Sequence, residues 1–133
     1  MKRIITLFMT GGAAYVLLEL AFRQCSHITM FFAGGTCFLL IHLFCNRLEH
    51  RCRLWIKCLT GATLITAVEL GFGLLFNRNF TVWDYSALPL NFLGQICLPF
   101  SILWAGITFP AMKLAQWLEK KFLTPKKEKK VSV

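Results

Sequence analysis

The sequence predicts an all-α, polytopic membrane protein whose four transmembrane helices form two tandem helical hairpins. Of its 133 residues, 56% are hydrophobic, which exceeds the roughly 45–50% apolar share of soluble domains. The apolar residues fall in four blocks, each close to the roughly 20 residues that cross a bilayer. These blocks almost lack the polar stripes at helical spacing that are typical of a soluble bundle.

The predicted transmembrane domain covers residues 1–112, and residues 113–133 form a basic tail. The four helices are expected at about residues 4–22, 28–45, 55–76 and 92–112. We expect the first helix to be retained, although it resembles a signal peptide. Pro99 falls inside the fourth helix, where its missing N–H predicts a kink.

The basic residues predict the orientation. Of the 15 Lys and Arg residues, only Arg23 and Arg78 fall in connections on one side of the predicted membrane. The others precede the first helix, separate the second from the third, or follow the fourth. The positive-inside rule therefore predicts both termini in the cytoplasm of a multi-pass cell-membrane protein. The net charge of +9 then indicates contact with anionic lipids at the tail, and nucleic-acid binding is not expected, because no aromatic residues alternate with the basic ones.

An internal repeat supports the two hairpins. Five residues of the first helix recur fifty positions later in the third: Thr10, Gly11, Glu19, Leu20 and Phe22 return as Thr60, Gly61, Glu69, Leu70 and Phe72. Three residues recur sixty positions apart in the second and fourth helices: Phe32, Gly34 and Cys37 return as Phe92, Gly94 and Cys97. Two-helix units in tandem keep the same orientation, so the predicted repeat is parallel.

The two repeated glutamates are the main candidates for a substrate- or ion-binding site. An ionisable residue at membrane depth costs a few kcal/mol and marks a functional site by default. Tyr15, Glu19 and Arg23 share one face of the first helix, and Thr66 and Glu69 share a face of the third. If the halves pack together, one arginine serves two carboxylates, which suits proton coupling or a cationic ligand. For Glu19 alone, a structural ion pair with Arg23 is the stronger interpretation.

The predicted outer connection between the third and fourth helices is the second candidate. It contains Trp83, Asp84 and Tyr85, and Asn91 leads into the fourth helix. One interpretation is an interfacial loop anchored by its aromatic residues. The other is an outer gate over the glutamates, with Asp84 as a third acidic group.

No catalytic, cofactor or metal site is predicted. The sequence has no Gly-rich phosphate-binding loop with its Lys-Ser/Thr, and no nucleophile stands out. The six cysteines do not suggest a disulfide framework. The run from His42 through Cys45, Glu49 and His50 to Cys58 matches no standard zinc spacing, and cations crowd it.

Several segments resemble the bacterial putative ABC-transporter type IV membrane proteins. They are Tyr15-Val16-Leu17-Leu18-Glu19 with Arg23, Thr60-Gly61 with Glu69, and Trp83-Asp84-Tyr85-Ser86 with Pro89-Leu90-Asn91 and Gly94. The resemblance covers roughly residues 8–108. It implies a small multi-pass protein labelled as a permease, whose ATPase is another polypeptide, and it carries over Glu19, Glu69, Trp83, Asp84, Tyr85 and Asn91 without a reaction.

The sequence therefore favours a transport-related role, as a permease or a permease subunit, with a Glu/Arg site and no enzymatic activity. Four helices enclose little volume, so a homo-oligomer is expected. Two alternatives stay open: a non-transporting membrane scaffold or assembly factor, and a small proton-coupled multidrug antiporter.

Overall fold

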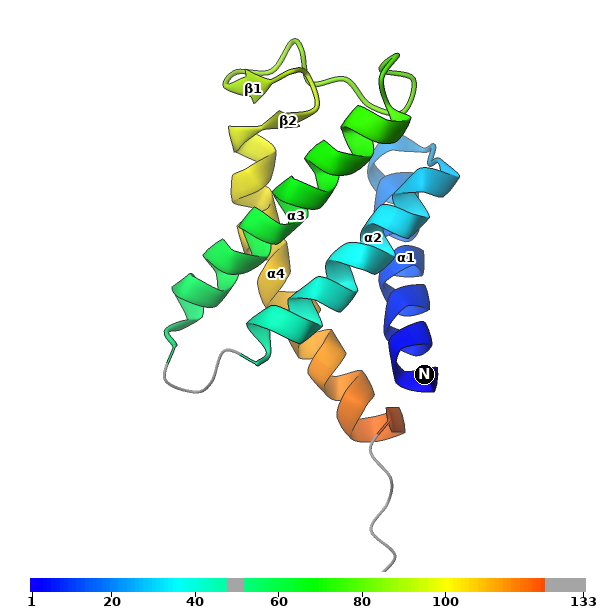
Figure 1. Cartoon of the computed structure of the whole chain (residues 1–133), viewed down its shortest axis with the longest axis vertical. Coiled ribbons are helices and arrows are strands. Elements are labelled where there is room, and N and C mark those ends of the chain that lie inside the picture. The colour runs from blue at the N-terminus through cyan, green and yellow to red at the C-terminus, as the bar shows by residue number, and fades with distance from the viewer. Residues whose placement is uncertain (48–51, 124–133) are drawn as a thin grey trace, which may run out of the picture.

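Four long helices form the molecule (Figure 1), in a computed structural model that describes residues 1–47 and 52–123. They are α1 (Lys2–Arg23), α2 (Ile28–Leu40), α3 (Leu54–Phe76) and α4 (Leu98–Leu118). A π-helical segment extends α2 over Ile41–Cys45 and another extends α4 over Glu119–Leu123. Within the described ranges, four helical spans are long and apolar enough to cross a membrane. This confirms a multi-pass, mainly helical membrane protein.

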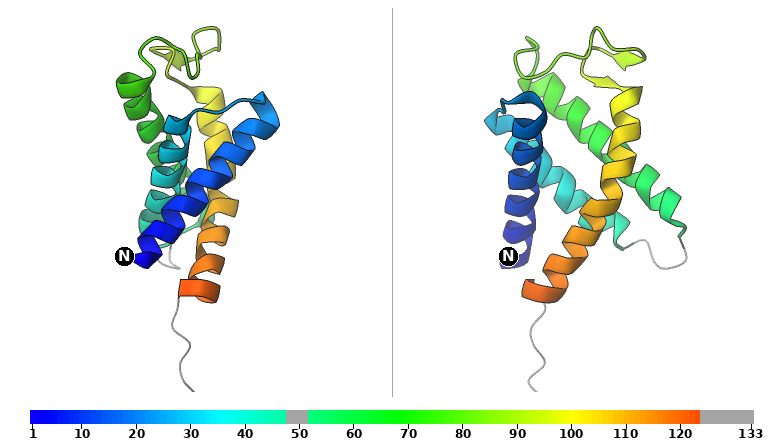
Figure 2. Two further views of the ribbon diagram at one scale, coloured as in Figure 1. Left: turned by 90° about the vertical axis from the view of Figure 1, so that its right-hand side faces the viewer. Right: turned by 180° about the vertical axis from the view of Figure 1, so that it is seen from behind.

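The helices pair as two hairpins. α1 packs mainly against α2, and α3 packs mainly against α4. Figure 2 shows the same arrangement from two further sides. We call the end that carries residues 77–97 the loop end, and the end that carries Met1 and Glu119–Leu123 the terminal end.

The approach of α1 to α2 depends on glycine. A Cβ atom on Gly12 would lie 2.7 Å from the Phe31 carbonyl oxygen, and one on Gly35 would lie 2.7 Å from that of Phe8. Both distances are closer than real Cβ atoms come to backbone oxygen. Small residues at such positions let helix backbones approach in a membrane, where packing rather than hydrophobic burial drives association.

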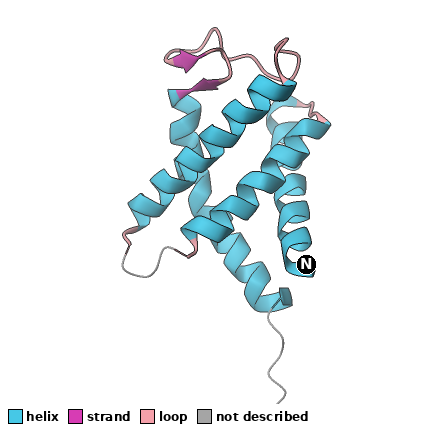
Figure 3. Cartoon of the chain, viewed as in Figure 1, coloured by secondary structure: helices cyan, strands magenta, loops and turns pink. Residues whose placement is uncertain are grey.

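The fourth helix differs from its prediction. It begins at Leu98 instead of residue 92, because a short antiparallel pair, β1 (Asn91–Phe92) and β2 (Ile96–Cys97), precedes it (Figure 3). Leu93 and Gly94 between the strands have φ of +55° and +66°, which a right-handed helix excludes. The predicted kink at Pro99 is also wrong. Pro99 lies in the first turn of α4, where its missing N–H has no helical partner to lose.

The fourth helix continues beyond residue 112, where its end is predicted. Residues 113–118 belong to α4 and Glu119–Leu123 continue it as a π-helical segment. Lys121 places its ammonium group 4.9 Å from the ring centre of Trp117, an aromatic–basic pairing suited to a membrane interface. Residues 124–133, like the candidate metal ligands Glu49 and His50, lie outside the described ranges.

A polar cluster joins the first and last helices at the terminal end. Arg3 forms an ion pair with Glu119, and His42 Nε2 lies 3.5 Å from Glu119 Oε2. Asn46 continues the cluster by donating to His42 Nδ1, and its side-chain oxygen accepts from Gln116. At the terminal end, this cluster therefore connects α1, the π-helical extension of α2, and α4 with its own extension.

Candidate functional site

Among the described residues, Glu69 is the acidic residue that is buried. It lies on α3, about 10 Å along the helix axis from Phe76, and is 7% exposed. The Tyr85 hydroxyl donates to Oε1 at 2.7 Å, and the Trp104 indole N–H donates to Oε2 at 3.1 Å. Each carboxylate oxygen therefore has a donor from a different element, one from the loop end and one from α4.

Packing against other aromatic rings fixes the positions of the two donor side chains, Tyr85 and Trp104. The Tyr85 ring stacks on Phe100 of α4, with centroids 4.8 Å apart and planes 12° apart. Trp104 lies one helical turn further along α4, and its ring centre is 6.1 Å from those of Phe100 and Tyr15. Rings locked in this way hold their polar tips in one direction, so the carboxyl group meets preorganised donors.

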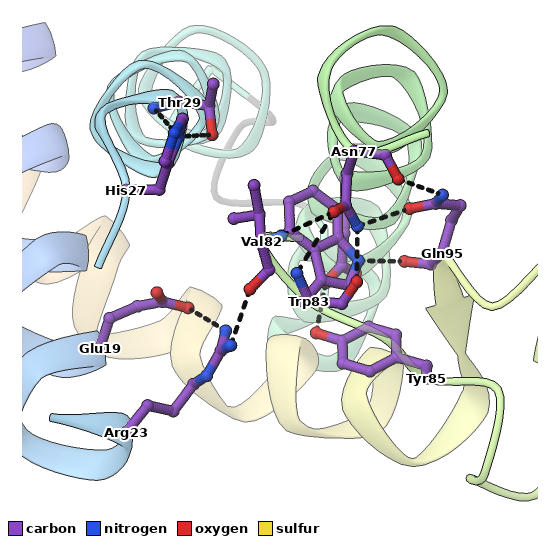
Figure 4. A network of polar contacts seen from close by, with 10 residues as sticks. Glu19, Arg23, His27, Thr29, Asn77, Val82, Trp83, Tyr85 and Gln95 are labelled. Carbon is purple, nitrogen blue, oxygen red and sulfur yellow. Dashed lines mark hydrogen bonds and ion pairs between the residues drawn. The ribbon is translucent and has the colours of Figure 1, made fainter. Parts of the chain in front are cut away.

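A second buried cluster shapes the loop above this site. Asn77, which is fully buried, donates to the Trp83 carbonyl oxygen at 2.7 Å and to Gln95 Oε1 at 3.0 Å. Its own side-chain oxygen accepts from the backbone N–H groups of Val82 and Trp83. Gln95 donates back to the Asn77 carbonyl oxygen, and the Trp83 indole donates to the Gln95 carbonyl oxygen. These bonds (Figure 4) give hydrogen-bond partners to backbone N–H and C=O groups where the chain turns away from α3.

The backbone at Gly94 completes the loop. Gly94 accepts a hydrogen bond from the Tyr85 N–H at 2.9 Å. Its φ of +66° and its close neighbours Ser86 and Phe80 leave no room for a side chain. The bond to Gly94 holds the Tyr85 backbone, so the direction of the Tyr85 hydroxyl depends on this glycine.

Glu19 occupies a different environment from Glu69. It pairs with Arg23 at 3.3 Å, and Arg23 also donates to the Val82 carbonyl oxygen at 2.7 Å (Figure 4). The Glu19 side chain is 10% exposed and that of Arg23 is 41% exposed. No ion pair joins Glu69 to a lysine or arginine in the part of the chain that the structure describes. The expected sharing of Arg23 by the two carboxylates is therefore wrong, and the internal repeat stays a prediction.

The two acids nevertheless hold the same stretch of loop. Glu19 acts through Arg23 on Val82, and Glu69 binds Tyr85 three residues later. Residues 82–85 are thus fixed to α1 on one side and to α3 on the other.

Tyr15 and Thr66 also lie near Glu69. Tyr15 shares with Glu69 a small cavity between the helices. The Thr66 hydroxyl forms a hydrogen bond with that of Ser101 at 2.9 Å, which links α3 to α4.

Asp84 and Asn91 belong to the loop surface. Asp84 is exposed and accepts hydrogen bonds from the hydroxyl and the backbone N–H of Ser86. These two bonds hold the pKa of Asp84 below its ordinary value. Asn91 caps the turn by donating to the Leu88 carbonyl oxygen and accepting from the Gly94 N–H. Asp84 is thus bound within the exposed loop, and its role as a third acidic group stays a prediction.

Burial and the neighbouring Glu69 together raise the pKa of Tyr85. Burial of the phenol raises its pKa well above the ordinary value, and the nearby charge of Glu69, to which the hydroxyl is bonded, raises it further. Tyr85 therefore keeps its hydroxyl hydrogen over the physiological pH range.

Sequence reasoning missed Asn77, Gln95 and Trp104. Asn77 and Gln95 flank the aromatic loop as uncharged amides, a signal that could have suggested a buried pair. Trp104 stands on an apolar helix, and nothing in the pattern separates it from a lipid-facing tryptophan. Because Tyr85 and Trp104 each donate to one oxygen of Glu69, the carboxyl group is arranged as a hydrogen-bond acceptor.

Comparison with known proteins supports one relationship. A family model described as putative ABC-transporter type IV matches residues 29–133. This range includes Glu69, Tyr85 and Trp104, whereas Tyr15, Glu19 and Arg23 precede it. Neither a curated protein nor a solved structure matches the chain.

Proposed function

The chain belongs to the putative ABC-transporter type IV family, and we propose that it acts in transport as a permease or as the membrane subunit of one. The observation that carries the proposal is Glu69, a carboxyl group buried in a membrane-spanning helix and held by two donors. A charged group at the centre of a membrane helix costs roughly 2.5–3.5 kcal/mol on insertion scales, so such residues mark pathways for ions, protons or substrates.

The geometry lets Glu69 control the loop. An ionised carboxylate accepts from both Tyr85 and Trp104. A protonated one carries a hydrogen on one oxygen, and that oxygen becomes a donor. An indole can only donate, whereas a tyrosine hydroxyl can also accept. A change of charge at Glu69 is therefore transmitted to Tyr85, and through it to residues 82–85, which serve as the gate in this proposal.

The proposal includes partners. The cavity beside Glu69 is about 20 Å³, too small for most solutes, so a pathway requires a second copy of the chain or another subunit. We propose that a separate polypeptide supplies ATP hydrolysis and that this chain has no enzymatic activity. We also propose that both termini lie in the cytoplasm, that the protein lies in the cell membrane and that anionic lipids contact the terminal end, as the positive-inside rule predicts from the basic residues.

Purification from native membranes tests the proposal. The full chain is purified as wild type and as Glu69→Gln, and ATP hydrolysis is measured after reconstitution at equal amounts of the chain. We expect an ATP-hydrolysing subunit in stoichiometric amount, and about tenfold lower hydrolysis with Glu69→Gln, which corresponds to a loss of about 1.4 kcal/mol.

Thr63→Val is the matched control, because Thr63 is exposed on α3 and its hydroxyl donates to the Leu59 carbonyl oxygen of the same helix. Hydrolysis should equal that of wild type. The proposal fails if no ATP-hydrolysing subunit accompanies the chain, or if Glu69→Gln supports full hydrolysis.

One observation favours the scaffold as a second candidate. Within the described residues, every buried side-chain nitrogen and oxygen has a hydrogen-bond partner, as expected where polar groups fix helix register. If the protein is a scaffold, Glu69→Gln should lower the amount of protein in the membrane, and the ATP hydrolysis measured per molecule should not change. The antiporter alternative predicts that the chain alone, in proteoliposomes with an imposed pH gradient, moves ethidium.

A further inference from the structure

A small cavity adjoins Glu69, and Tyr85 is not among the residues that line it. Side chains of all four helices line it, among them Tyr15, Cys37 and Trp104, and Trp83 closes it at the loop end. Its volume of about 20 Å³ is the space open to the centre of a water molecule. A buried water needs at least roughly 10–15 Å³ and two to four polar partners, so the cavity has room for one.

The polar groups around the cavity leave hydrogen-bonding capacity unused. The Tyr15 hydroxyl has no hydrogen-bond partner in residues 1–47 and 52–123. Glu69 uses one acceptor position on each oxygen, which leaves about two of its four. The Cys37 thiol adds a weak donor. The indoles of Trp83 and Trp104 are already engaged by Gln95 and Glu69.

We propose that one water molecule occupies this cavity, bridges Tyr15 to Glu69, and carries protons to the carboxyl group. The inference rests on the proposed function, because it supplies the route by which Glu69 changes its charge. The water gives one hydrogen to a Glu69 oxygen and takes the hydroxyl hydrogen of Tyr15. Tyr15 is restored by a proton from the loop-end side, so water and tyrosine are unchanged and one proton has moved.

The surroundings define where that proton enters. On α1, Glu19 and Arg23 lie one and two turns beyond Tyr15 on the same face, towards the partly exposed loop end. Cys37 faces the cavity from α2. Tyr85 faces the carboxyl group from the loop but does not line the cavity. Glu19 is therefore the acidic group of α1 that lies between Tyr15 and the loop end.

Hydrogen–deuterium exchange of the Glu69 carboxyl group tests the inference. Purified protein is transferred to D₂O at acidic pH, and the shift of the protonated carboxyl band is followed by infrared spectroscopy. The band is assigned by its loss in Glu69→Gln. We expect Tyr15→Phe, which keeps the ring, to slow the exchange about tenfold, as the loss of one hydrogen bond of about 1.4 kcal/mol from the pathway would do.

A second variant removes the water but keeps the tyrosine. Ala33 lines the cavity, and Ala33→Val adds two methyl groups that fill it, so exchange should slow to a similar degree. Thr63→Val should exchange like wild type. Equal exchange rates in wild type, Tyr15→Phe and Ala33→Val would overturn the inference.

The two proposals fail separately. Slow exchange in both variants, together with ATP hydrolysis that is independent of Glu69, would support the relay and reject the permease role. Fast exchange in both variants, with Glu69-dependent hydrolysis, would support the permease role and reject the relay.

Discussion

The hydroxyl of Tyr85 lies 2.7 Å from Oε1 of Glu69 and donates a hydrogen bond to it. This contact joins the loop at one end of the bundle to the buried part of α3. Since Trp104 holds the other oxygen, the carboxyl group ties three segments together: α3, α4 and the loop. Four predictions follow from this arrangement and from the loop that it supports.

Removing Glu69 should cost far more stability than removing Glu19. In Glu69→Ala the buried donors of Tyr85 and Trp104 lose their acceptor, at about 1–3 kcal/mol each. In Glu19→Ala the loss is at most about 1 kcal/mol, because Arg23 is substantially exposed and an i,i+4 pair at a surface contributes little. Denaturant unfolding in detergent micelles measures both. Equal losses would contradict the different environments of the two acids.

Asn77 should be the residue on which the loop depends most. Asn77→Ala leaves the N–H groups of Val82 and Trp83 without an acceptor and breaks the bond to Gln95, so we expect a loss of about 3 kcal/mol. Asn91→Ala is the matched control, since Asn91 is exposed and water can replace its bonds. The same unfolding measurement compares them. A loss at Asn91 as large as that at Asn77 would show that burial does not decide the effect.

Gly94 should not tolerate alanine, although other glycines should. A Cβ atom there would meet the Ser86 hydroxyl and the Phe80 ring, at a φ of +66°, so Gly94→Ala should cost about 1–3 kcal/mol. A Cβ atom on Gly106 meets nothing within 4 Å. Gly106→Ala should therefore be neutral or stabilise the protein by up to about 1 kcal/mol, through helix propensity. A neutral Gly94→Ala would mean that the turn is not held as described.

Tyr85 should resist ionisation in the folded protein. Tyr15→Phe leaves Tyr85 as the single tyrosine, so an ultraviolet absorbance titration reports on it alone. Its raised pKa predicts little phenolate near pH 10, where a free tyrosine ionises. The folded state then binds more protons than the unfolded state above this pH. Stability is therefore complete below pH 10 and falls as the pH rises further. Phenolate formation at the ordinary pH in folded protein would contradict the buried contact with Glu69.

The sequence was a good guide to the helices and a poor one to their junction with the loop. Hydropathy located α1, α3 and the combined span of α2 and its π-helical extension within two residues at each end. It placed the start of α4 six residues early, because Phe92 and Leu93 are as apolar as a membrane helix while their backbone follows turn geometry. Pro99 was misplaced for the same reason.

For the candidate site too, the sequence predicted some residues but not the contacts between them. The cost of a charge in a membrane singled out Glu69, and the aromatic and acidic residues singled out the loop. Their connection through Tyr85, and the roles of Asn77, Gln95 and Trp104, could not be predicted, since these partners lie 16 to 35 residues apart along the chain.

By itself, the sequence determined that the chain enters the membrane four times and that an acid lies within the third span, because transfer of each side chain from water to lipid depends on its own chemistry. Only the tertiary structure decided which groups meet that acid, since hydrogen bonds need donors and acceptors about 3 Å apart with aligned directions. That alignment arises when α3, α4 and the loop pack together.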